Sequence, residues 1–556
     1  MKRHFGVAAA VACALGAVAP GAALAHDGRG GSDQLRPGNL LVSGSTYREA
    51  DIQPEVTQPP PGCTAPCPTA IADGAYPYVF NNDQQDSSFG VTSPIDLWQL
   101  TPGGDVVSRT TVPTHELVTS FPSKSELALN LSTTGRAVTF MGYVARPKQL
   151  DVSNSNTPGV VDPTNPVPGT NYRAVAQLNA SGRFGFTETN AYSGNNGRAA
   201  ILNDQPGANV YYTAGNAGNG ANPQPAGVVA GAGAQIFSPS LKPEADQTPG
   251  APTPVGSFSI TQLGDKADKI GKDTNFRGLT IFNNVLYYTK GSGSNGVNTV
   301  YFVDTTGKAC PNGVGVPAAG AKLPTTSIPY DPATVASTGL SNNMCILRGF
   351  NTALAKNATD ASSYPFGIWF ANAHTLYVAD EGSGDNAFDT THGTYNAAAA
   401  STAAGLQKWV LDTKTEPTQP TWKLAYTLQT GLNLGTPYVV PGYPIGDNAV
   451  TKLPWAPATD GLRNITGRVN RDGSVTVWGV TSTVSGSGDQ GADPNQLVAI
   501  TDDPSASAAA AGEAFHTVMA PRYGRVVRGV SLTPGGSDGH VKHGRDRARG
   551  HARRLH

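Results

Sequence analysis

The stretch from Pro365 to Val410 contains the strand pattern that most constrains how this chain folds. Three short segments, Gly367–Ala371, Thr375–Asp380 and Leu406–Leu411, are rich in apolar, β-branched and aromatic residues, as β-strands are. A tight turn joins the first two, and a long loop with Gly, Asp and Asn precedes the third. Related units recur, with first strands that begin near residues 124, 198, 277, 366, 463 and 528. Such repeats predict a solenoid or a propeller, because one unit cannot bury both of its faces.

The two ends of the repeat array decide between these architectures. The first unit has strand patterns at Tyr76–Asn81, Ile95–Leu100 and Val106–Val112, but no innermost strand precedes them. The last segment, Arg528–Thr533, resembles the innermost strands and has no partner after it. Joined, the two ends make one blade, and a ring closed in this way leaves few free strand edges. The sequence therefore predicts an all-β fold, a six-bladed β-propeller closed by the C-terminal strand. Seven blades are the alternative, with a degenerate blade inside an insertion.

Composition agrees with a chain of short strands and turns. The 556 residues include 66 glycines and 43 prolines, and only 14% are charged. A basic start, an apolar run and Ala23–Ala25 predict a signal peptide over residues 1–25. We expect an N-terminal arm over residues 26–75, one propeller domain over residues 76–535 and a basic, disordered tail over residues 536–556. No later segment has about 18 consecutive apolar residues, so we expect a secreted protein, extracellular or periplasmic, without a transmembrane segment.

Charge is nearly balanced, with 39 Lys and Arg against 40 Asp and Glu. The basic tail after His540 leaves the rest of the mature chain net negative, which argues against a nucleic-acid-binding body. We expect no nucleic-acid partner, and we expect a monomer. The tail is expected to be solvated, with contact to an anionic polymer or membrane surface as the alternative.

Four cysteines remain once the signal is removed: Cys63, Cys67, Cys310 and Cys345. An even number in an exported protein favours disulfides. We expect Cys63–Cys67 to clip the CTAPC loop and Cys310–Cys345 to close a long insertion. A zinc site is the alternative, but no histidine lies near any of the four.

Three segments carry a resemblance to a known family: LYVADEGSG (Leu376–Gly384), VYYTAGNAGNG (Val210–Gly220) and LYYTKGSGSNG (Leu286–Gly296). In each of them a β-rich strand runs into a Gly-rich polar loop. In this blade pattern the chain resembles the secreted six-bladed β-propellers of the NHL-repeat and gluconolactonase-like group. The metal site of that family combines Glu, Asn and Asp from inner strands, and no residue of this chain is matched to those positions.

Basic residues lie where the predicted inner strands begin, at Lys124, Arg198, Arg277, Arg463 and Arg528. In a propeller these positions lie at one end of the ring, around the central channel, where ligand sites usually lie. Converging guanidinium groups suit carboxylate, sulfate or phosphate, because their planar forks donate paired hydrogen bonds. The sequence thus predicts a site for an anionic small molecule or an extracellular polymer such as a polysaccharide. The alternative is that each cation pairs with an acid of a neighbouring loop and locks the blades together.

Acidic residues lie in the loops between second and third strands. Asp380, Glu381 and Asp385 occupy one such loop, and Asp489 and Asp493 occupy another. Calcium favours carboxylate oxygens on flexible loops, so these five are candidate calcium ligands. The alternative is that they only shape turns, for which aspartate is an ordinary choice.

The sequence leaves two hypotheses for function. The first is a binding module that holds an anionic ligand at the channel mouth. The second is a hydrolase, lactonase or polysaccharide lyase that uses the same mouth, with or without calcium. No G-x-S-x-G elbow follows a strand and opens a helix, and no H-E-x-x-H occurs, so neither motif supports the enzyme.

Aromatic residues give a weaker indication of carbohydrate contact. The tryptophans on predicted strands are expected in the core rather than as sugar platforms; they are Trp369, Trp409, Trp422 and Trp478. Tyr438, Tyr443 and Trp455 lie in a Pro-rich crossing segment and are the better candidates for contact with a sugar ring.

Overall fold

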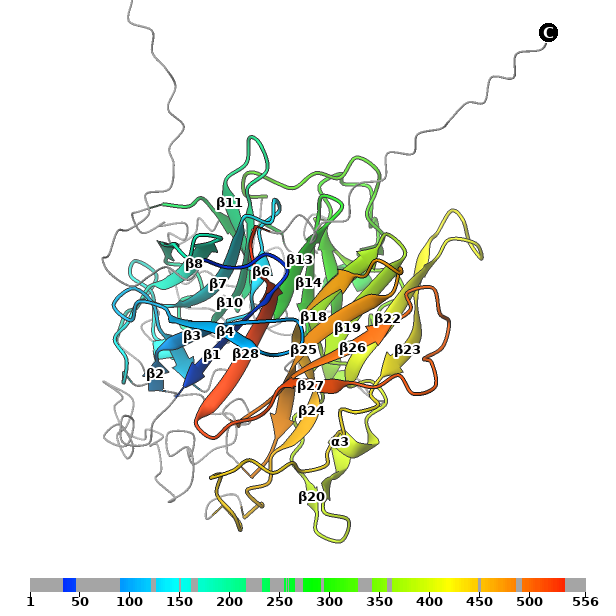
Figure 1. Ribbon diagram of the computed structural model, residues 1–556. Coiled ribbons are helices and arrows are strands. Elements are labelled where there is room, and N and C mark those ends of the chain that lie inside the picture. The colour runs from blue at the N-terminus through cyan, green and yellow to red at the C-terminus, as the bar shows by residue number, and fades with distance from the viewer. Residues whose placement is uncertain are drawn as a thin grey trace, which may run out of the picture.

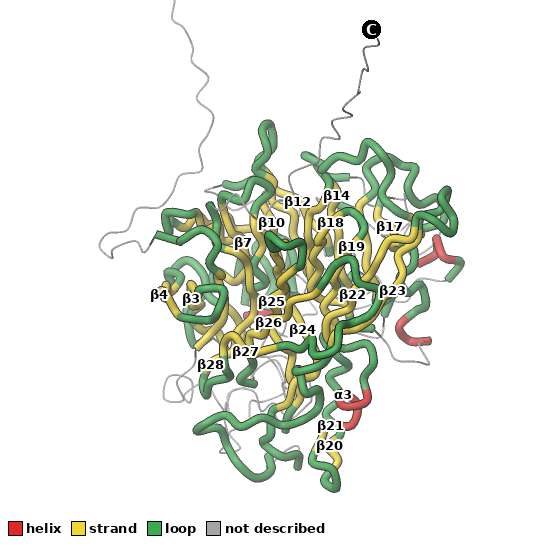
Figure 2. The backbone as a smooth tube through the Cα atoms, turned by 45° about the vertical axis from the view of Figure 1, so that its right-hand side comes forward, coloured by secondary structure: helices red, strands yellow, loops and turns green. Residues whose placement is uncertain are grey.

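Six small sheets carry almost all of the regular structure in the computed structural model (Figures 1 and 2). The structure describes residues 34–46, 91–121, 127–149, 152–161, 169–216, 233–240, 255–256, 258, 260–265, 274–291, 295–328, 343–357, 363–448, 452–486 and 493–535. Within these ranges there is one α-helix, the short α3 (Asn396–Ala400). No helix in the described part is both long and apolar enough to cross a membrane.

Each sheet is one blade, and its strands follow in chain order from the ring centre outward, with two exceptions that involve β28 and β16. From the innermost strand outward, blade 1 contains β28 (Arg525–Leu532), β1 (Leu40–Thr46), β3 (Ile95–Leu100) and β4 (Val106–Thr111), and blade 2 contains β6 (Asn130–Leu131), β7 (Ala137–Tyr143), β8 (Arg173–Asn179) and β9 (Phe184–Thr189). Blade 3 contains β10 (Gly197–Asn203), β11 (Val210–Gly215) and β12 (Ala234–Phe237), and blade 4 contains β13 (Gly278–Phe282), β14 (Val285–Lys290), β15 (Thr299–Val303), β17 (Met344–Leu347) and β16 (Val314–Gly315). Blade 5 contains β18 (Pro365–Asn372), β19 (Thr375–Asp380), β22 (Gly405–Asp412) and β23 (Thr421–Leu428), and blade 6 contains β24 (Ala458–Val469), β25 (Val475–Val484), β26 (Leu497–Asp502) and β27 (His516–Met519).

The innermost strands form a closed ring. Strand β28 contacts β6, which contacts β10, and the series continues through β13, β18 and β24 back to β28. Six blades are therefore present, as the repeat pattern predicts. Apolar side chains fill the space between adjacent blades; for example, Trp478 of blade 6 packs in one cluster with Trp98 and Val527 of blade 1.

The two ends of the chain complete one blade, so the closure predicted from the sequence is confirmed. Strand β28, red in Figure 1, pairs antiparallel with β1, drawn in blue, and β1 pairs with β3. Asn464 of β24 strengthens this closure, because its side-chain oxygen accepts the Val530 N–H at 2.7 Å and the Leu129 N–H at 3.4 Å. One buried amide thus joins three consecutive blades.

The second strand of blade 1 differs from the prediction. We expected Tyr76–Asn81 in this place and an arm without core strands over residues 26–75, but β1 (Leu40–Thr46) fills the position, and Leu40–Ser45 are all buried. Apolar and polar residues alternate only weakly in LLVSGST, because neighbouring blades cover both faces of this strand. Tyr76–Asn81, the signal peptide and the tail over residues 536–556 lie outside the described residues.

Glycines at the starts of inner strands let neighbouring blades approach closely. A Cβ atom added at Gly529 of β28 would overlap the carbonyl oxygen of Leu127, which precedes β6. The same addition at Gly367 of β18 would overlap the carbonyl oxygen of Arg463 on β24. A Cβ atom at Gly278 of β13 would likewise overlap the carbonyl oxygen of Phe366, so the second residue of the Arg277-Gly278 and Arg528-Gly529 pairs has a packing reason.

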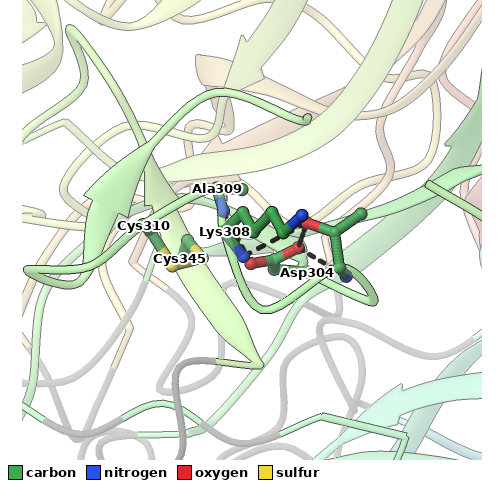
Figure 3. Close-up of a disulfide and its surroundings, with 6 residues drawn as sticks. Asp304, Lys308, Ala309, Cys310 and Cys345 are labelled. Atoms are coloured by element: carbon green, nitrogen blue, oxygen red, sulfur yellow. Dashed lines mark hydrogen bonds between the residues drawn. A yellow bond between two sulfur atoms is a disulfide. The ribbon is translucent and has the colours of Figure 1, made fainter. Parts of the chain in front are cut away.

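The predicted bond between Cys310 and Cys345 is present (Figure 3). Cys345 lies on β17, the fourth strand of blade 4, and Cys310 lies in the loop between β15 and β16; their Cα atoms are 6.0 Å apart. Beside them, the carboxylate of Asp304 shapes this loop by accepting the Ala309 N–H at 2.8 Å. The second expected pair, Cys63–Cys67, lies outside the described residues.

Loss of the Cys310–Cys345 bond is expected to lower the free energy of unfolding by about 3–4 kcal/mol, the loop-entropy value for a 35-residue separation. Chemical denaturation of the double serine variant, Cys310→Ser with Cys345→Ser, measures this directly. Equal stability of the oxidised parent and the double variant would mean that the bond does not constrain the unfolded chain.

Candidate functional site

The inner strands define two ends of the central channel. We call the end at which they begin the starting face, and the end at which tight turns lead to the second strands the turn face. Because first and second strands are antiparallel, Pro365 at the start of β18 pairs with Asp380 at the end of β19. Loops that follow second strands therefore lie on the starting face, together with the starts of the inner strands.

Four of the predicted cations occupy equivalent positions at the starting face. In blades 1, 3 and 6, the register between the inner and second strands shifts at the residues that include Arg528, Arg198 and Arg463. Arg277 immediately precedes β13 in blade 4. Such β-bulges re-aim side chains and are common beside functional sites. The fifth cation, Lys124, lies outside the described residues.

Three of these arginines are largely buried, and two of them, Arg198 and Arg463, bridge blades. Arg198 donates hydrogen bonds to the side-chain oxygen of Asn275 and, at 2.9 Å, to the Phe276 carbonyl oxygen. The Nε of Arg463 lies 3.2 Å from Oε2 of Glu381 on blade 5. Arg528 is only 4% exposed, and Arg198 and Arg463 are 6% exposed. The Arg463–Glu381 pair agrees with the blade-locking alternative, and the two hydrogen bonds of Arg198 given above join blades 3 and 4.

Two buried carboxyl groups lie beside this pair. Asp380 accepts hydrogen bonds from the Ser363 hydroxyl and the Tyr364 N–H, both at 2.7 Å. These bonds lower the pKa of its carboxyl group, but burial has the larger effect and raises that pKa to about 6. Burial likewise raises the pKa of Asp460 on β24 to about 7, although the nearby Arg463 opposes the shift. Oδ2 of Asp460 accepts the Gly384 N–H at 2.7 Å, and its Oδ1 has no hydrogen-bond partner among the described residues.

Asp460 makes folding stability depend on pH. Its pKa rises on folding, so between about pH 4 and pH 7 the folded state holds a proton that the unfolded chain releases. The free energy of unfolding must then fall as pH rises through this window. Asp460→Asn is expected to remove about 2–4 kcal/mol of that fall, as measured by chemical denaturation at about pH 4 and about pH 7, the ends of the window. Asp472→Asn, in an exposed turn, is the control; a Asp460→Asn profile parallel to the parent would contradict the burial argument.

The candidate calcium ligands do not come together in the described part of the chain. No three carboxylates among Asp380, Glu381, Asp385 and Asp493 lie within ligand distance of one another, and Asp489 lies outside the described residues. The Asp385 side chain caps its own turn by accepting the Ala387 N–H at 2.9 Å. Calcium binding stays a prediction, since calcium also takes carbonyl and amide oxygens.

Most of the aromatic candidates for sugar contact serve the core. Tyr443 and Trp455 are 7% and 6% exposed and pack in one cluster, and the Tyr443 hydroxyl donates to Oδ1 of Asp493 at 2.6 Å. The Tyr438 hydroxyl donates to the Pro494 carbonyl oxygen at 2.8 Å. Among the strand tryptophans, Trp422 and Trp478 are buried as expected. Trp369 differs, because it is half-buried and lines a cavity at the turn face.

Comparisons with known proteins do not assign this chain to a family. No protein-family model matches the chain, and no curated protein does. One solved structure that matches is of a PL25 ulvan lyase, described as a new family of polysaccharide lyase, bound to a saccharide containing GlcA. It has a TM-score of 0.28 and 12% sequence identity, over 85% of this chain and 97% of that chain. Similarity at this level carries no argument about the function of this chain.

Proposed function

We propose that this chain is an exported β-propeller that binds an anionic small molecule or an extracellular polysaccharide on its starting face. The observation that carries the proposal is the equivalent placement of Arg198, Arg277, Arg463 and Arg528 on four blades of one ring. A structural role alone does not require the same residue type at the same bulge in separate blades. Export is supported by the signal-like N-terminus and by the Cys310–Cys345 bond.

The chemistry of the arginines favours oxyanions. A guanidinium group stays charged at any physiological pH and offers five donors in a planar fork, which matches carboxylate, sulfate and phosphate. Low exposure of Arg198, Arg463 and Arg528 gives their surroundings a low dielectric, in which a charge-assisted hydrogen bond is stronger than in water. An acidic polysaccharide would present several oxyanions to this set of arginines at once.

Thermal-shift and calorimetric titrations with sulfated, phosphorylated and uronic-acid ligands test this proposal at low salt. We expect a stabilising shift that decreases as salt is added, because screening weakens contacts between charges. Arg277→Gln should weaken binding, and Arg471→Gln should not, because Arg471 lies in the exposed turn after β24. No shift with any of these ligands, or equal loss in both variants, would refute anion binding at the starting face.

An enzyme at the same face is the second candidate, a hydrolase, lactonase or polysaccharide lyase. Its support is the pair of carboxyl groups of Asp380 and Asp460, whose pKa values lie near neutrality. A general acid or base works best when its pKa is close to the operating pH. If this candidate holds, Asp460→Asn should abolish turnover of a lactone or uronic-acid polymer while anion binding persists. Turnover that survives this change, or that is absent from the parent, would exclude Asp460 as the acid or base.

A further inference from the structure

The turn face carries a cavity that is separate from the arginines of the starting face. Its volume is about 470 Å³, within the usual range for small-molecule sites. Residues from the innermost strands of all six blades line it, among them Leu131, Ile201, Ile281, Phe370, Thr466 and Leu532. It is therefore the mouth of the central channel at the end opposite to the one that the sequence singles out.

Among the residues that the structure describes, none that lines this cavity is charged. Its polar side chains are amides and hydroxyls, and several make no hydrogen bond with other described residues: Gln205, Thr280, Asn283, Asn284 and Thr466. An amide offers two donors and an acceptor, and a hydroxyl offers one donor and acceptor lone pairs. Such a set complements a ligand whose own groups both donate and accept.

Aromatic rings supply the apolar part of the cavity. Trp369 of β18 is half-buried, and its ring lies against the backbone of Gly467 on β24, where an added Cβ would overlap the ring atoms. Phe282 of β13 stacks on Phe370 of β18, with ring centroids 4.5 Å apart. An indole face beside free amides gives a site with one apolar surface and one hydrogen-bonding surface.

We propose that this cavity binds a neutral polyhydroxylated ligand of the mono- or disaccharide class. The hydroxyl groups of a sugar both donate and accept hydrogen bonds, and its C–H face packs on an aromatic ring. A carboxylate or sulfate would lose hydration here without meeting a cation among the described lining residues, so charged sugars are disfavoured. The site differs from the proposed anion site in position, in charge and in ligand.

The turn between β13 and β14 allows a sharp test. Asn283 and Asn284 form the two-residue turn and have φ angles of 48° and 61°, in the left-handed region that glycine adopts freely. Glycine at both positions removes the two amides and keeps the turn. The matched control is Asn433→Gly, because Asn433 has φ 51° and does not line the cavity.

Calorimetry and saturation-transfer NMR with matched probe pairs test the proposal: glucose with glucuronate, galactose with galacturonate, and the neutral disaccharides of each sugar. We expect at least one neutral probe to bind, and its uronate to bind at least about tenfold more weakly. Asn283→Gly with Asn284→Gly should weaken the neutral probe about tenfold or more, and so should Trp369→Ala, whereas Asn433→Gly and Arg277→Gln should not.

Three results would overturn the proposal: no neutral probe binds at millimolar concentration, the uronate binds as tightly as its neutral partner, or the double glycine variant binds like the parent. Thermal melting of each variant establishes that it is folded. Because Arg277 lies at the starting face and Asn284 at the turn face, the two variants separate failure of this site from failure of the anion site.

Discussion

A chain that ends at Gly524, and so lacks β28, is expected to lose cooperative thermal unfolding. Strand β28 pairs with β1 and contacts β6 and β24, so its removal opens the ring at both neighbours. Val527 and Val530 are at most 1% exposed, and their loss uncovers the apolar surface between blades 1 and 6. The edge of β1 would also be left without a partner, which favours aggregation. Circular dichroism during heating and size-exclusion chromatography measure these changes.

Truncation after Gly535 is the matched control. It removes only the basic segment over residues 536–556 and keeps every residue of β28, so the melting temperature should stay that of the parent. Gly529→Ala is a milder test of the same closure, because the added methyl group would overlap the Leu127 carbonyl oxygen. Gly103→Ala is its control, because a methyl group there meets almost no neighbouring atom. A cooperative, monomeric protein after truncation at Gly524 would show that closure does not hold the ring together.

Lys408→Met is expected to lower the free energy of unfolding by about 3–5 kcal/mol, which is the usual result of removing one partner of a buried ion pair. The Nζ of Lys408 on blade 5 lies 3.1 Å from Oδ2 of Asp502 on blade 6, and both side chains are at most 1% exposed. The Tyr377 and Tyr426 hydroxyls also donate to the Asp502 carboxylate. Without the ammonium group, Asp502 would be a buried charge with no cation beside it among the described residues.

The control for this change is Lys423→Met. Lys423 makes an ion pair of 2.6 Å with Asp412, but its side chain is 58% exposed, and solvent screens such pairs. We expect little change in the urea midpoint for Lys423→Met and a large decrease for Lys408→Met. Equal effects of the two substitutions would mean that the Lys408–Asp502 pair does not join blades 5 and 6.

Much of the fold can be predicted because each blade repeats one pattern in a continuous stretch. The strands of blade 5 follow the alternation and turn signals around Pro365–Val410. The C-terminal strand is identifiable because RGVSLT resembles RGLTIF at Arg277–Phe282. Strand β1 escaped prediction, because LLVSGST lies alone between polar segments and its partners are far away in the chain.

The site is predictable only where it follows the repeat. Equivalent positions of Arg198, Arg277, Arg463 and Arg528 can be read from the spacing of the inner strands, but their partners cannot, because Glu381 is 82 residues from Arg463. The burial that shifts the pKa of Asp460 depends on how blade 5 lies against blade 6, which no local pattern encodes.

Trp369 illustrates the same limit. Its place on a β-strand favours a core role, and only the close approach of Gly467 from the next blade brings its ring to the channel mouth. The cavity at the turn face is likewise assembled from six separate strands, and none of them carries a recognisable motif by itself.

Hydrogen–deuterium exchange of β1 and β28 in the intact protein tests most directly the claim that the two ends of the chain form one blade. If they do, peptides covering Leu40–Thr46 and Arg525–Leu532 will exchange as slowly as those of β24, and Gly529→Ala will speed both together. Rapid exchange of either strand while β24 stays protected would contradict the closed ring, and with it both proposed sites.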